Sequence, residues 1–110
     1  MTATFIHRGD AIEHIPLTDL PAGSVVVQAS LVGIATHPIP AGHLGALQLT
    51  GVFDVPRTPG GVMGVGFRLY WDAASQMATI HDDGGANPYL GRVVRESDDG
   101  DATVRIRLEQ

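Results

Sequence analysis

Glycine and proline are frequent and are spread along the whole chain. The 110 residues include 14 Gly and 7 Pro, nearly one residue in five, against an average usage of about 12%. In a helix interior Gly costs about 1 kcal/mol and Pro about 3 kcal/mol relative to Ala, so long helices are disfavoured. The 11 Val, 7 Ile and 8 Thr favour strands, because β-branched side chains pack well on a pleated surface. The composition predicts a turn-rich, all-β fold.

Turn signals divide the chain into short segments with strand character. About eight to ten such strands predict a β-sandwich or barrel-like domain with little or no helix. We expect one compact domain over residues 1–110, and only Gly61–Gly66 is a candidate for a helical turn. The expected strands are Thr4–His7, Ala11–Ile15, Ser24–Gln28, Leu31–Ala35, a longer run between His43 and Val55, Phe67–Trp71, Met77–His81, Tyr89–Glu96 and Ala102–Leu108.

Pairing between these segments follows from the turns that join them. Gly9-Asp10 predicts a hairpin between the first two segments, and short polar loops predict hairpins for Phe67–Trp71 with Met77–His81 and for the last two segments. The run from His43 alternates apolar and polar residues, with Gly51 as a bulge or close-approach point. The last segment alternates most clearly: Ala102, Val104, Ile106 and Leu108 share one face, and Thr103, Arg105, Arg107 and Glu109 share the other.

Missing residue types exclude several kinds of chemistry. The chain has no Cys, which excludes disulfides, thiolate nucleophiles and cysteine zinc sites. It has no Lys, which excludes Schiff-base enzymes and the P-loop lysine. The net charge of −5 argues against a nucleic-acid partner. No membrane-spanning run and no signal peptide are present, so we expect a soluble protein that starts inside a cell.

Local motifs give no catalytic site. Gly61–Gly66 has the glycine spacing of a P-loop, but Phe67 and Arg68 replace the phosphate-binding Lys and the Mg²⁺-binding Ser or Thr. Asp98-Asp99-Gly100-Asp101 lacks the ordered spacing of a calcium loop, and no Ser lies in a nucleophile elbow. We predict no catalytic residue, no metal and no cofactor.

One loop leaves an alternative open. His81-Asp82-Asp83 offers a nitrogen and two carboxylates, a set that can bind a metal. The same residues precede Gly84-Gly85, where Asp is expected simply because it favours turns. The alternative reading of the whole chain is therefore a small ligand- or metal-binding β domain with a loop His/Asp site.

Adjacent aromatic residues point to a surface. Tyr70 and Trp71 are neighbours in an expected strand, so one ring points inward and the other outward. The outward ring is either covered by a loop or part of an interface, where aromatic residues are enriched. Arg105 and Arg107 lie on the polar face of the last strand. Tyr70, Trp71, Arg105 and Arg107 form our candidate subunit interface.

Five stretches, in order along the chain, carry a resemblance. They are Phe5–Ile12, with an aromatic-aliphatic-polar-x-Gly-Asp opening; Leu31–Ala35 followed by Ile39–Gly45; Leu47–Pro56, containing Gly-Val-Phe; Leu69–Asp72, containing Tyr-Trp-Asp; and Leu90–Val93 followed by Gly100–Leu108. This ordered set resembles the capsid cement, or head decoration, family of tailed bacteriophages. Members often carry a recombinase-like label, which the failed P-loop contradicts. The family's Ala-rich, Lys-containing stretch before Tyr-Trp-Asp is Gly60–Gly66 here.

The resemblance implies a structural role without catalysis. Such proteins sit on the outer surface of the phage head, as homotrimers at three-fold or quasi-three-fold positions, and clamp subunits of the major capsid protein after expansion. The resemblance also implies synthesis in the cytoplasm of the bacterial host, and it implies no membrane partner. A free N-terminal strand can pair with a partner's edge strand, so the candidate capsid-facing residues are Thr2, Ala3, Thr4, Phe5, Ile6 and His7. The same segment can equally be the first strand of the domain.

Overall fold

The computed structural model describes residues 1–110 and is built almost entirely of antiparallel strands. Nine strands form two sheets, which confirms the all-β prediction and its strand number. The only helix is a single 3₁₀ turn, Asp83–Gly85, and none lies in Gly61–Gly66. No helix is long and apolar enough to cross a membrane. The strands are β1 (Ala11–His14), β2 (Val25–Gln28), β3 (Leu31–Ile34), β4 (Gly45–Gln48), β5 (Thr50–Pro56), β6 (Arg68–Asp72), β7 (Met77–Thr79), β8 (Tyr89–Arg95) and β9 (Thr103–Glu109).

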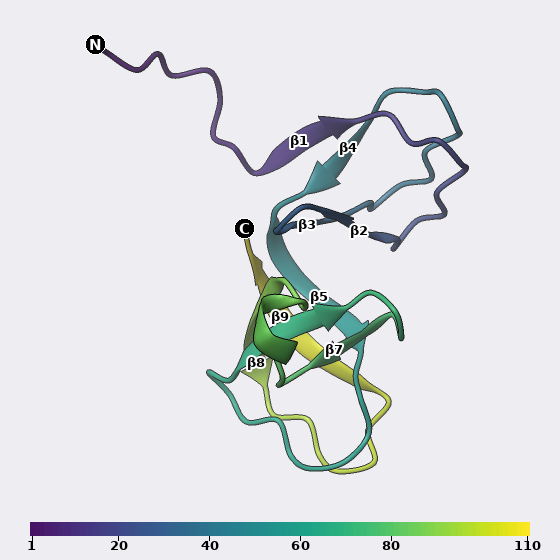
Figure 1. Ribbon diagram of the computed structural model, residues 1–110, viewed down its shortest axis with the longest axis vertical. Helices are drawn as coiled ribbons and strands as arrows, with labels where there is room; N and C mark the ends of the chain where they lie inside the picture. Colours follow the sequence, from purple (N-terminus) through teal and green to yellow (C-terminus); the bar gives the residue numbers. More distant parts are fainter.

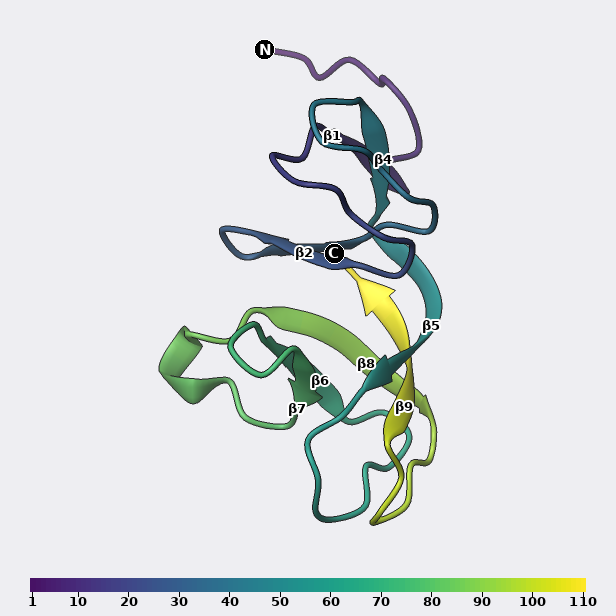
Figure 2. The same ribbon diagram turned by 90° about the vertical axis from the view of Figure 1, so that its right-hand side faces the viewer.

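The two sheets lie one above the other (Figures 1 and 2). The upper sheet has the order β1-β4-β3-β2 and the lower sheet the order β5-β9-β8-β6-β7. The chain passes between them at Leu49, whose N–H donates to the Asp10 carbonyl oxygen at 2.8 Å. The predicted run between His43 and Val55 is therefore two strands. Of the two alternatives for Gly51, the bulge is wrong, because the β5–β9 ladder continues through that residue without a shift. The close approach fits, since a Cβ there would lie 3.1 Å from the Phe53 ring.

Most of the core lies between the five-stranded sheet and the β2–β3 hairpin. Val32 and Ile34 of β3 share one apolar cluster with residues of β5 to β9. Val104, Ile106 and Leu108 are buried as the alternation predicts, whereas Ala102 is exposed because the β9 ladder begins at Thr103. A second, smaller cluster of Ala35, Ile39 and Leu47 fills the four-stranded sheet's own half of the molecule.

The five-stranded sheet curls so that its two end strands meet. A bridge joins Arg57, next to β5, to Ala78 of β7, and the Thr58 N–H donates to the Ala78 carbonyl oxygen at 2.9 Å. Closing a sheet in this way removes part of its free edge. The lower half of the molecule is accordingly barrel-like, and its convex face is left to solvent.

Pairing of the N-terminal segment differs from the prediction. Thr4–His7 is not a strand, and Ala11–His14 pairs with β4 instead of with that segment. The physical reason lies in burial. Opposite Leu47 in the β1–β4 ladder, Ile12 packs against the smaller apolar cluster, whereas a hairpin with Thr4–His7 would leave it outside the core. Both hairpins predicted for the C-terminal half, β6–β7 and β8–β9, are confirmed.

Candidate interaction surfaces

The N-terminal nine residues form an arm that extends away from the strands (Figure 1). Every residue in it is exposed, including Phe5 at 81% and Ile6 at 79%. Its polar contacts are local: the Gly9 N–H donates to His7 Nδ1 at 2.9 Å, and Arg8 lies 3.5 Å from Asp10. Two large apolar side chains without a core to enter are suited to a surface supplied by a partner. Thr2, Ala3, Thr4, Phe5, Ile6 and His7 all lie in this arm.

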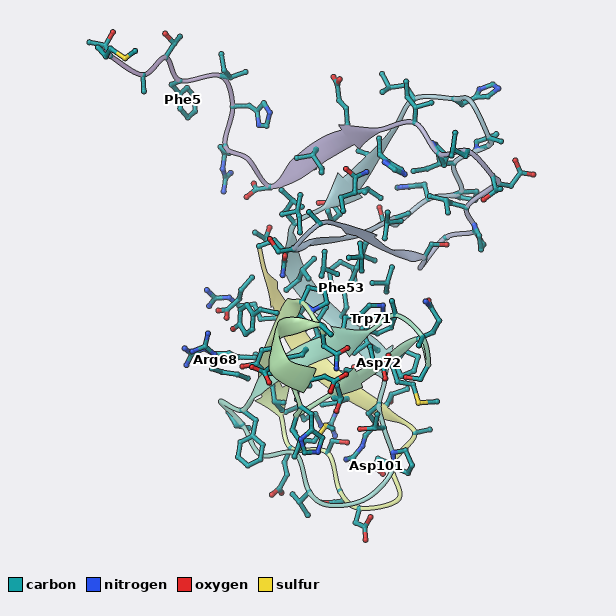
Figure 3. All side chains as sticks on the ribbon, in the orientation of Figure 1. Phe5, Phe53, Arg68, Trp71, Asp72 and Asp101 are labelled. Carbon is teal, nitrogen blue, oxygen red and sulfur yellow. The ribbon has the colours of Figure 1, made fainter.

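The convex face of the five-stranded sheet carries most of the positive charge. Cross-strand pairing places Arg107 of β9 beside Arg92 of β8, and Arg92 beside Arg68 of β6. One step along, Arg105 of β9 lies beside Arg95 of β8. All five guanidinium groups are on exposed residues, and Figure 3 shows Arg68 projecting outward from the sheet. We call Arg68, Arg92, Arg95, Arg105 and Arg107 the arginine face; it holds five of the seven arginines in the chain.

Two carboxylates partly neutralise the arginine face. Asp54 of β5 accepts two hydrogen bonds from Arg105, from Nε at 2.9 Å and from Nη2 at 3.1 Å. These hydrogen bonds lower the pKa of Asp54 and raise the pKa of Arg105. Glu109 is shared between Arg92 at 3.6 Å and Arg107 at 3.4 Å. Arg68 and Arg95 take part in no ion pair.

Two tyrosines order one corner of this face. The Tyr70 and Tyr89 rings pack edge to face with centroids 5.9 Å apart, and the Arg68 guanidinium lies 4.9 Å from the centre of the Tyr89 ring. The Tyr89 hydroxyl donates to Glu109 at 2.5 Å. The pKa of Tyr89 is raised, mainly because the side chain is partly buried and secondly because its hydroxyl donates to a carboxylate. Tyrosine and arginine, together with tryptophan, are the side chains enriched at binding hot spots.

Of the two adjacent aromatic residues, only Tyr70 is available at the surface. Tyr70 is half-buried on the convex side, whereas Trp71 is 2% exposed and belongs to the main apolar cluster. The prediction that one ring points inward and the other outward is confirmed. Trp71, although predicted as a subunit-interface residue, presents no exposed ring in the single chain, because its ring is covered by this chain's own core.

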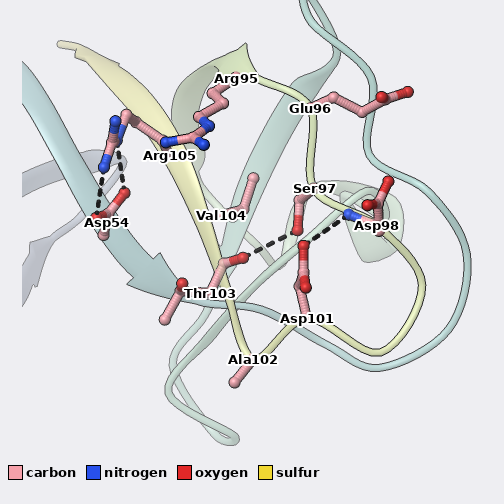
Figure 4. A pocket seen from close by; sticks show the side chains of 10 residues that line it. All are labelled: Asp54, Arg95, Glu96, Ser97, Asp98, Asp101, Ala102, Thr103, Val104 and Arg105. Atoms are coloured by element: carbon pink, nitrogen blue, oxygen red, sulfur yellow. Dashed lines mark hydrogen bonds and ion pairs between the residues drawn. The ribbon is translucent and has the colours of Figure 1, made fainter.

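A shallow polar pocket of about 350 Å³ borders the arginine face (Figure 4). In it the Ser97 hydroxyl donates to the Thr103 carbonyl oxygen at 2.9 Å, and the Asp98 N–H donates to Asp101 Oδ2 at 2.8 Å. These bonds shape the β8–β9 loop and do not activate a nucleophile, since the Ser97 proton goes to a backbone oxygen. The lining residues are Asp54, Arg95, Glu96, Ser97, Asp98, Asp101, Ala102, Thr103, Val104 and Arg105.

The loop that carries His81, Asp82 and Asp83 is shaped as a turn. The Asp82 carbonyl oxygen accepts hydrogen bonds from the N–H groups of Gly85 and Asn87, at 3.1 and 2.9 Å. No three His, Asp or Glu side chains gather anywhere in the structure as a metal site would require. Asp82 and Asp83 therefore lie in a turn, a position that aspartate favours.

Sequence reasoning found Arg105 and Arg107 but missed the other members of the arginine face. Arg92 and Arg95 are three residues apart, which in a regular strand places them on opposite faces. An extra residue at the register shift between Val93 and Arg95 returns both to the same face. The signal in the sequence was that Arg92 and Arg95 are three residues apart in a strand that otherwise alternates. Their position on one face could not be predicted without knowing that the strand has a bulge.

Comparison with known proteins identifies one family. Residues 6–108 match the family described as phage cement protein, so the match covers nearly the whole chain and includes the end of the arm, both sheets and the arginine face. A search of curated proteins and a search of solved structures each gave no match. With a family match over far more than half of its length, the chain belongs to the phage cement protein family.

Proposed function

We propose that this protein is a non-catalytic decoration protein that binds the outer surface of the expanded phage head as a homotrimer and stabilises it. The family supports a structural role associated with the phage capsid. The observation that carries the finer proposal is the arm, in which Phe5 and Ile6 are about four-fifths exposed and make no contact with the core. The proposed partner of the arm is the major capsid protein.

The arm is suited to strand addition on a capsid subunit. It has no secondary structure and no long-range hydrogen bond, so its backbone N–H and C=O groups, apart from the Gly9 N–H, are free to pair with an exposed sheet edge. The apolar rings and branches of Phe5 and Ile6 would be buried in that process. Ordering the arm costs conformational entropy, and the burial of these two side chains offsets part of that cost.

Exposed apolar side chains other than those of the arm lie in both halves of the chain, and some of them are next to the four-stranded sheet. Ile15 is 59% exposed, Leu17 98% and Leu44 63%, all in loops next to the four-stranded sheet. The arginine face lies in the other half, on the convex side of the five-stranded sheet. We assign the apolar arm to the capsid, and we assign Tyr70, Arg105 and Arg107 to contacts between subunits of the trimer.

A trimer gives head binding its strength through linked contacts. Three arms on one rigid body raise apparent affinity by roughly 10²–10⁴-fold over one arm, provided that all three reach their sites. A ligand that binds only the expanded lattice stabilises that state by about 2.7 kcal/mol for each site when its free concentration is 100 times its Kd. Clamping several capsid subunits therefore makes local opening of the head harder without any chemistry.

The test is a binding assay with purified expanded and unexpanded heads of the cognate phage. Wild-type protein should co-sediment with expanded heads and raise their temperature of disruption. The double variant Phe5→Ser and Ile6→Ser should lose at least about 10-fold in affinity, because two anchors are removed. Val65→Ser is the matched control, since Val65 is 67% exposed on the β5–β6 loop, away from the arm. Absence of wild-type binding to either kind of head would overturn the proposal.

A further inference from the structure

The arginine face contains three like-charge pairs that the fold itself does not need. Arg68 lies opposite Arg92, Arg92 opposite Arg107, and Arg95 opposite Arg105. Like charges directly opposite each other on neighbouring strands are destabilising. Asp54 and Glu109 are the two acids that pair with these five arginines, so the face keeps an excess of three positive charges. This arrangement fits a surface that meets negative charge from outside the subunit.

The opposite charge is concentrated at the end of the β8–β9 hairpin. Asp98, Asp99 and Asp101 occupy three of four successive positions in this loop, all exposed, and none forms an ion pair. The chain as a whole carries −5, so its excess of negative charge lies outside the arginine face, and Asp98 and Asp101 adjoin that face across the pocket that Arg95 and Arg105 also line. In Figure 3 Arg68 extends from one side of the sheet, while Asp101 lies at the end of the molecule away from the arm.

The acidic loop is held in shape before any partner arrives. The Arg57 guanidinium donates to the Asp98 carbonyl oxygen at 3.1 Å, and the Gly61 N–H donates to Asp99 Oδ1 at 3.1 Å. On the other surface, Tyr89 positions the Arg68 guanidinium over its ring. Groups that are already ordered lose less entropy on binding. Both surfaces are therefore prepared for a charge-matched contact.

We propose that the arginine face binds the acidic β8–β9 loop of a second copy of this chain, in a head-to-tail contact that closes into a ring. The proposal rests on the homotrimer proposed above and names the surfaces that build it. A two-fold contact of the arginine face with itself would place arginine against arginine. A heterologous contact instead joins the arginine face of one subunit to the acidic loop of the next. Such contacts generate a closed ring when the rotation that relates neighbouring subunits adds up to a full turn.

Charge reversal on each surface tests the contact through sedimentation of the purified protein at low ionic strength. Arg68→Glu with Arg95→Glu reverses the two arginines that have no ion pair of their own, and Asp98→Arg with Asp99→Arg reverses the loop. Each double variant should weaken self-association at least about 30-fold. The quadruple variant restores complementarity and should return to within about 10-fold of wild type. Arg8→Glu, on the arm, is the control and should associate as wild type.

Cysteine cross-linking locates the contact on decorated heads and in solution. The chain has no Cys, so introduced thiols have no background. Val52→Cys lies beside Arg107 in the ladder, and Ala102→Cys adjoins Asp101. A protein with both should give dimers and trimers with a short bismaleimide, whereas neither single variant should. Cross-linking by Val52→Cys alone would overturn the proposal in favour of a two-fold contact.

The remaining outcomes separate this inference from the proposed function. Heads that are decorated without any cross-link, or that lose decoration on charge reversal while self-association is unchanged, would overturn the inference and assign the arginine face to an acidic capsid surface. Cross-links that form although no head is decorated would support the inference and overturn the cement function. Specific binding of the arginine face to an acidic nucleic acid, lost in the Arg68→Glu and Arg95→Glu variant, would also overturn it.

Discussion

Arg57 and Ser97 are joined by two hydrogen bonds from one guanidinium nitrogen. Arg57 Nη1 donates to the Ser97 carbonyl oxygen at 3.2 Å and to the Ser97 hydroxyl oxygen at 2.9 Å. Arg57 is 3% exposed. Its Nη1 also donates to the Asp98 carbonyl oxygen in the β8–β9 loop, and its Nε and Nη2 donate to carbonyl oxygens of the β5–β6 loop. A buried arginine with only neutral acceptors fastens two loops together. It therefore supports the shape of the acidic loop.

Because Arg57 is buried, removing this clamp should lower the stability of the fold and leave the exposed arginines unchanged. Arg57→Met leaves several buried carbonyl oxygens without a donor, and we expect the free energy of unfolding to fall by about 3 kcal/mol or more. Ser97→Ala should cost about 1–2 kcal/mol. Urea unfolding monitored by Trp71 fluorescence measures both. Arg68→Met, on the exposed face, is the matched control and should change stability by no more than about 0.5 kcal/mol. Equal effects at the two arginines would contradict the clamp.

Gly91 should tolerate no side chain. A Cβ there would lie 2.0 Å from the Arg107 carbonyl oxygen and 3.2 Å from the Leu108 Cα, both in the neighbouring backbone. Gly91→Ala should therefore destabilise the protein by about 3 kcal/mol or more, since the β8–β9 ladder must move apart. Gly64→Ala, where the nearest atoms belong to the Phe67 ring at 3.3 Å, should cost clearly less. Thermal unfolding compares the two, and similar midpoints would contradict the packing at Gly91.

Tyr89 should titrate at a higher pH than an ordinary tyrosine. Partial burial and the hydrogen bond to Glu109 raise the pKa of Tyr89 above its ordinary value of 10.0. Because the folded pKa is higher than the unfolded one, this contribution to stability is full below about pH 10 and is lost as pH rises through the folded pKa. Absorbance at tyrosinate wavelengths should show a late step that Tyr89→Phe removes. A late step that persists in the Tyr89→Phe variant would show that the assignment is wrong.

The arm should contribute nothing to the stability of the isolated fold. Phe5→Ser with Ile6→Ser removes two exposed side chains, so the free energy of unfolding should stay within about 0.5 kcal/mol of wild type. Leu47→Ala, at a residue 1% exposed, should cost about 2–5 kcal/mol. Chemical denaturation of the three proteins tests this contrast. A large loss in the arm variant would mean that the arm packs on its own subunit.

The fluorescence of Trp71 should report on the packing of the core and should not change when subunits assemble. This residue is the only Trp in the chain and is 2% exposed, so its emission should be blue-shifted relative to the unfolded protein and poorly quenched by acrylamide. Because the ring is covered within one subunit, neither property should change when subunits associate. A shift in Trp71 emission that follows oligomer concentration would place this residue at the subunit interface after all.

How much the sequence determined differs between local and long-range features. The many glycines and prolines imposed short strands, and the strict alternation from Thr103 to Leu108 gave β9 its buried and exposed faces. The two C-terminal hairpins followed from short turns between matched segments. These features depend on neighbours in sequence, and the conformational preferences of single residues are enough to predict them.

Only the tertiary structure decided which strands meet across longer distances. In the folded chain β1 pairs with β4 and not with the arm, because Ile12 gains a partly buried position in that pairing. The tertiary structure placed Trp71 in the core and made Arg57, which directly follows β5, a buried clamp between two loops. It also gathered arginines from β6, β8 and β9 on one face. Which residues lie side by side on neighbouring strands is set by the strand register and by bulges. The register in turn depends on which strand pairing buries the most apolar surface over the whole chain.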